Sequence, residues 1–332
     1  MDGLLTLTIL IIFFTLAFSF INGFHDTANA ISTSVSTRAL KPRQAILLAS
    51  VMNFIGAMTF TGVAQTITED IVDPFTLPNG SLVILAALIA AISWNLVTWY
   101  YGIPSSSSHA IIGAIAGAAI AATGFSTLNY NGFIKILEAL LLSPIIAFLL
   151  GYIVYSIFKL LFNNNNLTKM NKGFRFTQII TAALQAFTHG TNDAQKAMGI
   201  ITMALIANDY LSSNMIPFWV QLACAIAMSL GTSFGGWKII KTISGNIMKI
   251  RPAIGVAADL SSVIIIFGAT FIGLPVSTTH VLSSSIMGVG TSHRSKGVKW
   301  RTSQRMIITW SITLPISATL AGLIYYVLNF IF

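Results

Sequence analysis

Residues 23–30 have the sequence Gly-Phe-His-Asp-Thr-Ala-Asn-Ala, and residues 190–197 have the related sequence Gly-Thr-Asn-Asp-Ala-Gln-Lys-Ala. Each stretch places one aspartate, Asp26 or Asp193, inside a long apolar segment. An ionisable group at membrane depth is costly, and by default it marks a substrate or ion pathway. Two such groups at matching positions indicate a transporter that is built from two repeats.

The composition places both stretches in a membrane protein. The chain has 332 residues, of which 55% are hydrophobic and 8% are charged, and its mean hydropathy is +0.81. Soluble domains carry about 25% charged residues. The sequence therefore predicts an all-α polytopic membrane protein. The single cysteine, Cys224, excludes an internal disulfide framework.

The basic residues are concentrated in a few polar segments. The formal net charge is +9, and 16 of the 18 Lys and Arg residues lie in four such segments. These are Arg38, Lys41 and Arg43; Lys159, Lys169, Lys172 and Arg175; Lys238, Lys241, Lys249 and Arg251; and Arg294, Lys296, Lys299, Arg301 and Arg305. This is the positive-inside bias of membrane proteins and argues against a nucleic-acid surface. It predicts a multi-pass protein of the cell membrane with both termini extracellular.

Ten apolar segments predict ten crossings: 4–37, 45–67, 81–101, 105–122, 136–158, 176–206, 217–236, 252–272, 275–290 and 303–330. The first and sixth exceed one straight span of about 30 Å, so each must tilt, protrude or break. The short segments 105–122 and 275–290 are compatible with re-entrant hairpins, and broken helices would raise the count to twelve. We predict two inverted-topology repeats of about five spans each, 1–158 and 176–332, joined by a cytoplasmic linker, 159–175.

A second pair of matching stretches supports this division. Residues 102–109 are Gly-Ile-Pro-Ser-Ser-Ser-Ser-His, and residues 273–280 are Gly-Leu-Pro-Val-Ser-Thr-Thr-His. Helices that open at Ser105 and Ser277 would present unpaired N–H groups and hydroxyls, which bind tetrahedral oxyanions. The alternative is that these small residues only pack membrane helices together. The candidate anion ligands are Ser105, Ser106, Ser107, Ser108, Ser277, Thr278 and Thr279, with Thr191 and Gln195 from the second aspartate motif.

The aspartate motifs themselves are candidate cation sites. Their oxygen ligands suit Na⁺ or a bound proton, and an anion in a low-dielectric site needs a compensating cation. The alternative is a pair of structural polar networks. The candidates are His25, Asp26, Asn29 and Asn22 in the first half, and Asn192, Asp193 and Lys196, with His189 beside them, in the second. The histidines at 25, 109, 189 and 280 suggest a proton relay or a divalent-metal site, although no two are spaced i, i+4.

Two features that suggest an enzyme are weak. Gly231-Thr232-Ser233-Phe234-Gly235 fits a nucleophile-elbow pattern, but it lacks the strand–turn–helix context that this motif requires. Ser108, His109 and Asp26 could form a hydrolytic set, but a serine and histidine adjacent in sequence seldom align for proton transfer. We therefore expect neither catalysis nor a cofactor.

The paired motifs closely resemble those of the PiT family of inorganic phosphate transporters, over essentially the whole chain. The resemblance implies a homodimer in the plasma membrane that transports phosphate. It implies Asp26, Asn29, Asn192 and Asp193 as cation-site residues that could hold Na⁺, and the residues 105–108 and 277–279 as phosphate ligands. His25 replaces the asparagine that is frequent in the family. This form is similar to the bacterial low-affinity branch, which is associated with proton coupling and metal–phosphate uptake.

The resulting hypothesis is a symporter that imports inorganic phosphate, alone or as a metal–phosphate complex, with H⁺ or Na⁺ by alternating access. Two other transporters remain open. A sulfate permease on the same scaffold would bind a similar oxyanion, and a divalent-metal transporter would use the histidines.

Overall fold

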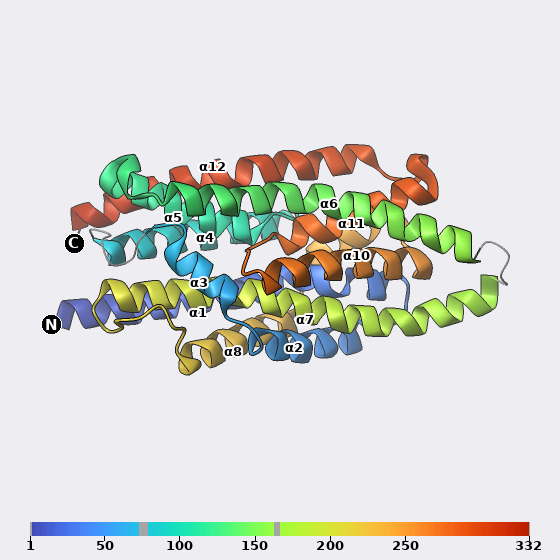
Figure 1. The fold of residues 1–332 in the computed structure, drawn as a ribbon, viewed down its shortest axis with the longest axis horizontal. Coiled ribbons are helices and arrows are strands. Elements are labelled where there is room, and N and C mark those ends of the chain that lie inside the picture. Colours follow the sequence, from blue (N-terminus) through green and yellow to red (C-terminus); the bar gives the residue numbers. More distant parts are fainter. Residues whose placement is uncertain (1, 73–78, 163–166, 332) are drawn as a thin grey trace.

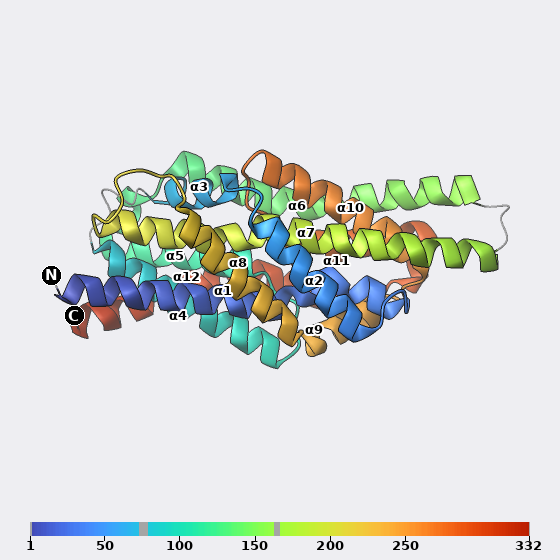
Figure 2. The same ribbon diagram turned by 90° about the horizontal axis from the view of Figure 1, so that it is seen from below.

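A computed structural model describes residues 2–72, 79–162 and 167–331 (Figure 1). Within these ranges the chain is almost entirely helical, and the one extended pairing is an isolated bridge between Val72 and Leu128. The described helices lie roughly along one long axis, with both termini at the same end (Figures 1 and 2). The prediction of an all-α membrane protein is confirmed.

Residues up to 162 form the first set of helices. They are α1 (Asp2–Ser36), α2 (Pro42–Ala57), α3 (Gly62–Glu69), α4 (Gly80–Tyr100), α5 (Ser107–Thr123), the 3-10 turn η1 (Gly124–Thr127) and α6 (Tyr130–Phe162). Pro42 lies in the first turn of α2, where its missing N–H costs nothing. The chain bends by 66° between α2 and α3, so these two helices form one broken segment.

Residues from 167 form a second set in a similar order. They are α7 (Leu167–Ala207), α8 (Phe218–Phe234), α9 (Trp237–Lys241), the π-turn η2 (Thr242–Asn246), α10 (Pro252–Phe271), α11 (Thr278–Arg294), the 3-10 turn η3 (Ser295–Gly297) and α12 (Trp300–Ile331). Helices α1 and α7 run in opposite directions in Figure 1, as do α6 and α12. This order is the one expected of inverted repeats, while the boundaries 1–158, 159–175 and 176–332 stay a prediction.

The two segments that were too long for one straight span are continuous helices. Helix α1 has 35 residues and α7 has 41, so they extend over about 50 and 60 Å at 1.5 Å per residue. Each aspartate motif therefore lies within an unbroken helix. Of the three expected outcomes, tilting, protrusion and breaking, the break is absent from both.

Two helical hairpins bring the Gly-x-Pro stretches to the interior. The hairpin of α4 and α5 enters and leaves on the side of the molecule where the termini lie. The hairpin of α10 and α11 enters and leaves on the opposite side (Figures 1 and 2). Both turns reach the middle of the long axis. Residues 104–109 and 275–280 are buried, and the Ser108 hydroxyl donates to the Val276 carbonyl at 2.9 Å. The two hairpin tips are therefore in direct contact.

Close backbone approach fixes the helices that carry the motifs. A Cβ on Gly231 of α8 would collide with the carbonyl of Phe20 on α1, and one on Gly190 of α7 would collide with the backbone of Asn53 on α2. Because both glycines lack a Cβ, α8 packs directly on α1 and α2 packs directly on α7.

The outer helices carry the apolar surface of the molecule. Leu141, Leu149 and Leu160 on α6 and Tyr326 and Phe330 on α12 are among the exposed large side chains. By length and hydropathy, six described helices can cross a membrane, or seven if the bent α2–α3 pair counts as one span. The number of ten crossings stays a prediction, because the four helices of the two hairpins meet at turns inside the molecule.

Candidate transport site

Asp26 lies on α1, where hydroxyls from both hairpin tips converge on it. Ser107, at the start of α5, donates to its Oδ2 at 2.7 Å, and Thr279, in the first turn of α11, donates to its Oδ1 at 3.1 Å. His25 Nδ1 lies 2.8 Å from the same Oδ1. The carboxylate is 2% exposed, so these groups replace its hydration.

Asp193 lies on α7 and has a more highly charged environment. Thr278, the first residue of α11, donates to its Oδ2 at 2.7 Å, and His189 Nε2 lies 3.0 Å from that oxygen. Lys196, one turn further along the helix, forms an ion pair with Oδ1. All three polar partners of this carboxylate are buried.

Lys196 connects the two hairpin tips. Its fully buried ammonium donates to the Ser108 hydroxyl at 2.6 Å and to the Val276 carbonyl at 3.1 Å, in addition to Asp193. Three N–H donors therefore meet three oxygen acceptors, which satisfies the ammonium completely.

The two asparagines of the first motif reach the same hydroxyls. Asn29 donates through Nδ2 to Thr279 at 2.7 Å, and Asn22 accepts at Oδ1 from Ser107 at 2.9 Å. Both side chains are buried, and each retains one polar atom without a recorded partner, Oδ1 of Asn29 and Nδ2 of Asn22. An orphaned buried acceptor is costly, so Asn29 Oδ1 is suited to a bound cation.

Both short helices of the hairpin tips are capped by serine. Ser106 accepts from the N–H of His109 at 3.1 Å, and Ser277 accepts from the N–H of His280 at 3.3 Å. The caps place the first helical residues at Ser107 and Thr278, so α5 opens later than at the expected Ser105. Since the caps use the two serine oxygens, the following hydroxyls are directed at the carboxylates.

Ser105 and the remaining histidines are arranged around this centre. Ser105 donates to Thr98 of α4 at 2.8 Å, and that hydroxyl lies 3.2 Å from His25 Nε2. The rings of His109 and His280 are 4.5 Å apart, and His280 stacks on Trp310 of α12. The second histidine pair therefore lies between the hairpin tips rather than on the carboxylates.

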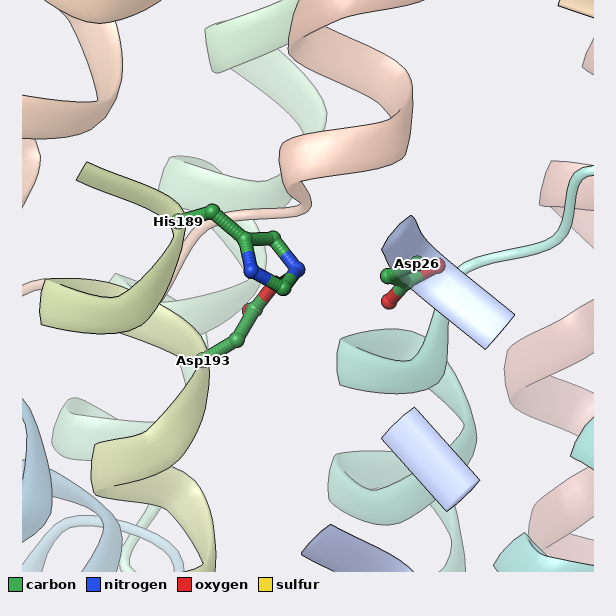
Figure 3. A group of neighbouring side chains, drawn as sticks. All are labelled: Asp26, His189 and Asp193. Atoms are coloured by element: carbon green, nitrogen blue, oxygen red, sulfur yellow. Dashed lines mark ion pairs between the residues drawn. The ribbon is translucent and has the colours of Figure 1, made fainter. Parts of the chain in front are cut away.

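Figure 3 shows Asp26 on one side of the site and His189 and Asp193 on the other, directed toward one another. One ligand atom from each of these residues lies within 4.8 Å of the other two. Carboxylate oxygens are ligands for hard cations, and imidazole extends the choice to transition metals. The geometry thus fits a cation held between α1 and α7.

Three predicted site residues on α7 make contacts away from the two carboxylates. Asn192 donates to Thr270 at 3.0 Å and to the Leu274 carbonyl at 3.2 Å, and its Oδ1 accepts from the Val276 N–H at 3.1 Å. Thr191 donates to the Thr188 carbonyl, and Gln195 contacts the Thr191 carbonyl and accepts from the Ala64 N–H. In this conformation Asn192 positions the second hairpin turn, and Gln195 joins α7 to α3.

Sequence reasoning placed His189 at the site but did not predict the individual contacts of the two histidines beside the aspartates. His189 is four residues before Asp193, and this i, i+4 spacing was a usable signal for their contact. Asn53 and Thr98 carried no such signal, because they reach His189 and His25 only through the packing of α2 and α4.

A site of this kind defines the class of protein. Paired buried aspartates on long helices, with the starts of two hairpin helices between them, are typical of a membrane transporter. A model of the phosphate transporter family matches residues 22–171 and 162–321, and the chain belongs to this family, PiT.

The descriptions of individual relatives agree with this family assignment. The chain is 75% identical over 333 residues to a probable low-affinity inorganic phosphate transporter of Bacillus subtilis (strain 168), covering 100% of both chains. It is 43% identical over 331 residues to a protein of the same description from Rhizobium meliloti (strain 1021), covering 98% of both. It is also similar to a solved structure described as the sodium-dependent phosphate transporter, with a TM-score of 0.89, 25% identity and coverage of 98% of this chain and 100% of that one.

Proposed function

We propose that this chain is a secondary active symporter that imports inorganic phosphate together with H⁺ or Na⁺ by alternating access. One observation carries the proposal: hydroxyls at the starts of α5 and α11 converge on two buried aspartates. Membership of the phosphate transporter family and the similarity to phosphate transporters supply the identity of the anion.

The anion would bind where the two hairpin tips meet. Helix starts carry partial positive charge and unpaired N–H groups, and both are favourable for phosphate. Ser107, Thr278 and Thr279 add hydroxyl donors, and Lys196 adds a full positive charge beside Ser108. We include Ser105, Ser106, Ser108 and Ser277, with Thr191 and Gln195, as candidate ligands of other transport states.

The cation would bind between the aspartates. Two carboxylates beside a phosphate repel it, so a cation on Asp26 and Asp193 lowers the cost of anion entry. Asn29 Oδ1, which has no recorded partner, is a further ligand for Na⁺. A proton would instead be taken up by one of the carboxylates or by His25. Asn22 and Asn192 belong to this proposal as neighbours that hold the hairpins.

The hairpins provide a route for alternating access. Their tips approach the site from opposite ends of the molecule and touch through Ser108 and Val276 (Figure 1). Withdrawal of one tip would open the site to one end only, while α1 and α7 remain in place.

The group of Asp26, His189 and Asp193 supports one extension of this function. Its two carboxylates and one imidazole are suited to a divalent metal, which could enter with phosphate as a neutral complex. Transport of the free metal, and transport of sulfate in place of phosphate, are the competing functions.

We also propose the surroundings of the protein. It would lie in the cell membrane with lipid on the exposed apolar faces of α6 and α12, both termini outside, and a second copy as a homodimer partner. The function needs no resident cofactor. The Ser108 hydroxyl donates to the Val276 carbonyl and His109 Nδ1 contacts Ser106, so their geometry supports transport more than a hydrolytic relay.

Uptake of labelled phosphate by proteoliposomes tests the proposal. A proton or sodium gradient is imposed in separate experiments, with and without Mg²⁺, and unlabelled sulfate is added as competitor. We expect one gradient to drive phosphate uptake and sulfate to compete weakly. Absence of gradient-driven phosphate uptake contradicts the proposal, and equal competition by sulfate would favour the sulfate permease.

A further inference from the structure

The two aspartate motifs differ at one position that matters for charge. Asn29 follows Asp26 by three residues, and Lys196 follows Asp193 by three residues. Each pair lies on one face of a continuous helix, α1 or α7. The first half therefore carries a neutral amide where the second half carries an ammonium.

The contacts show that these two residues occupy equivalent places. Asn29 donates to the hydroxyl of Thr279 on α11, and Lys196 donates to the hydroxyl of Ser108 on α5. Ser108 and Thr279 hold the same position in the two Gly-x-Pro stretches, immediately before the histidine. Each motif thus reaches the tip of the hairpin that belongs to the other half.

The surroundings of Lys196 resemble those of a bound metal ion. Its Nζ is surrounded by a carboxylate oxygen of Asp193, a hydroxyl oxygen of Ser108 and a carbonyl oxygen of Val276. Carboxylate, hydroxyl and carbonyl oxygens are the ligands of hard cations such as Na⁺. The side chain is fully buried, so no water competes for these oxygens.

Asp26 has no comparable partner. Among the described residues, its recorded ion pair is with His25, and its other partners are the hydroxyls of Ser107 and Thr279. Asn29 Oδ1, beside it, is buried and has no recorded hydrogen bond. The first half therefore has a vacant acceptor where the second half has its own positive charge.

We infer that Lys196 is a permanently bound cation of the second half, and that the transporter couples phosphate to a single exchangeable cation at Asp26 and Asn29. This inference rests on the proposed function, because it assigns the number of coupling cations to that same site. The asparagine and lysine at equivalent positions decide which half exchanges its cation.

Phosphate binding to the purified, detergent-solubilised full chain tests the inference. Calorimetric titration with inorganic phosphate is repeated over a series of Na⁺ concentrations at fixed pH and over a pH series at fixed Na⁺. Below saturation, one linked cation makes phosphate binding about tenfold tighter for each tenfold rise in that cation, and two make it about a hundredfold tighter.

We expect the one-cation dependence in the wild type and the two-cation dependence in Lys196→Asn, because Asp193 then needs a free cation. Lys135→Asn is the matched control, since it removes an exposed lysine by the same substitution. An unchanged dependence in Lys196→Asn overturns the inference. So does loss of phosphate binding at every cation concentration by folded protein, because a free cation would then be unable to replace the ammonium.

The reciprocal variant, Asn29→Lys, decides the question by itself if Lys196→Asn does not fold. It supplies the first half with its own cation, and we expect phosphate binding to lose its cation dependence. A dependence equal to that of the wild type overturns the inference. Failure of wild-type phosphate uptake under both the proton and the sodium gradient would contradict the proposed function instead, and the proteoliposome experiment distinguishes this outcome.

Discussion

The two aspartates of the site lie in matching positions but have different partners. Around Asp26 the recorded contacts are two hydroxyls and His25. Around Asp193 they are one hydroxyl, His189 and the ammonium of Lys196. Asp193 thus belongs to a nearly neutral buried pair, whereas Asp26 depends on hydrogen bonds alone or on a charge that comes from outside.

This difference shows how a repeated architecture can acquire separate roles. The side-chain contacts of the two motifs are alike in this respect, since each motif donates to a hydroxyl at the hairpin tip of the other half. A single change from amide to ammonium is sufficient to make one half self-compensated. The predictions below test this comparison, beginning with the largest expected effect.

Replacement of either aspartate should have the same effect on coupled uptake but a different effect on the stability of the protein. Asp26→Asn and Asp193→Asn should each abolish coupled phosphate uptake. Only Asp193→Asn leaves a buried ammonium without its carboxylate, and it should lower the free energy of unfolding by about 3–5 kcal/mol. Uptake assays and thermal unfolding in detergent measure the two effects.

The double variant Asp193→Asn with Lys196→Met is the control for this first prediction. Removal of both charges should restore most of the stability without restoring uptake. Equal destabilisation by the two single aspartate variants would remove the distinction between the halves, and normal uptake in both would give the aspartates a structural role.

The hydroxyls that reach the carboxylates form the next pair. Ser107→Ala and Thr278→Val each remove one hydrogen bond to a charged group, worth about 1.5–3 kcal/mol. We expect phosphate affinity to fall in both variants by about 10- to 100-fold. Ser283→Ala, on the same helix as Thr278, removes a hydroxyl without a recorded partner and should retain wild-type affinity. Similar losses in all three variants would contradict a direct role of the two hydroxyls.

The two motifs also differ at His25, because the second motif has Asn192 at the matching position. A histidine can carry a proton at physiological pH, whereas an asparagine can only ligate a cation. We expect His25→Asn to shift phosphate uptake from dependence on a proton gradient toward dependence on a sodium gradient, measured in the same proteoliposomes. An unchanged ion dependence would exclude His25 as the determinant.

The smallest effect concerns the support of the hairpin tips. The Trp310 indole donates to the Pro104 carbonyl at 3.1 Å and holds the first tip, whereas Asn192 and Lys196 of α7 hold the second. Trp310→Phe should lower stability by about 0.5–1.5 kcal/mol and leave cation dependence unchanged. Thermal unfolding and the cation series check this, and an altered cation dependence would show that the tips are not held independently.

Much of this arrangement was predictable from the sequence. Hydropathy identified the helical segments, and the doubled motifs brought Asp26, Asp193 and the hydroxyl residues to one site. The Gly-x-Pro stretches predicted helix starts in the interior, because serine favours the cap, although α5 starts at Ser107 rather than at Ser105. These inferences succeeded because each depends on local chemistry or on repetition.

The remainder depends on tertiary packing. Asp259 is fully buried and accepts hydrogen bonds from Thr33 and Thr181. Its position along α10 can be predicted from the sequence, but its burial between α1 and α7 cannot. Asn192 shows the same limit, since its contacts with the second hairpin turn depend on how α7 meets α10.

The hydroxyls of Ser107, Thr278 and Thr279 have one further consequence. Each has a single hydrogen. Those of Thr278 and Thr279 are directed at an aspartate, and that of Ser107 lies between Asp26 and Asn22. A hydroxyl can donate its hydrogen to a phosphate oxygen only when its hydrogen bond to the aspartate breaks. The carboxylate then needs a cation in place of that hydrogen bond. These hydroxyls have fewer hydrogens than the aspartate and phosphate oxygens can accept together. Full coordination of the anion therefore requires that the cation binds to the carboxylates.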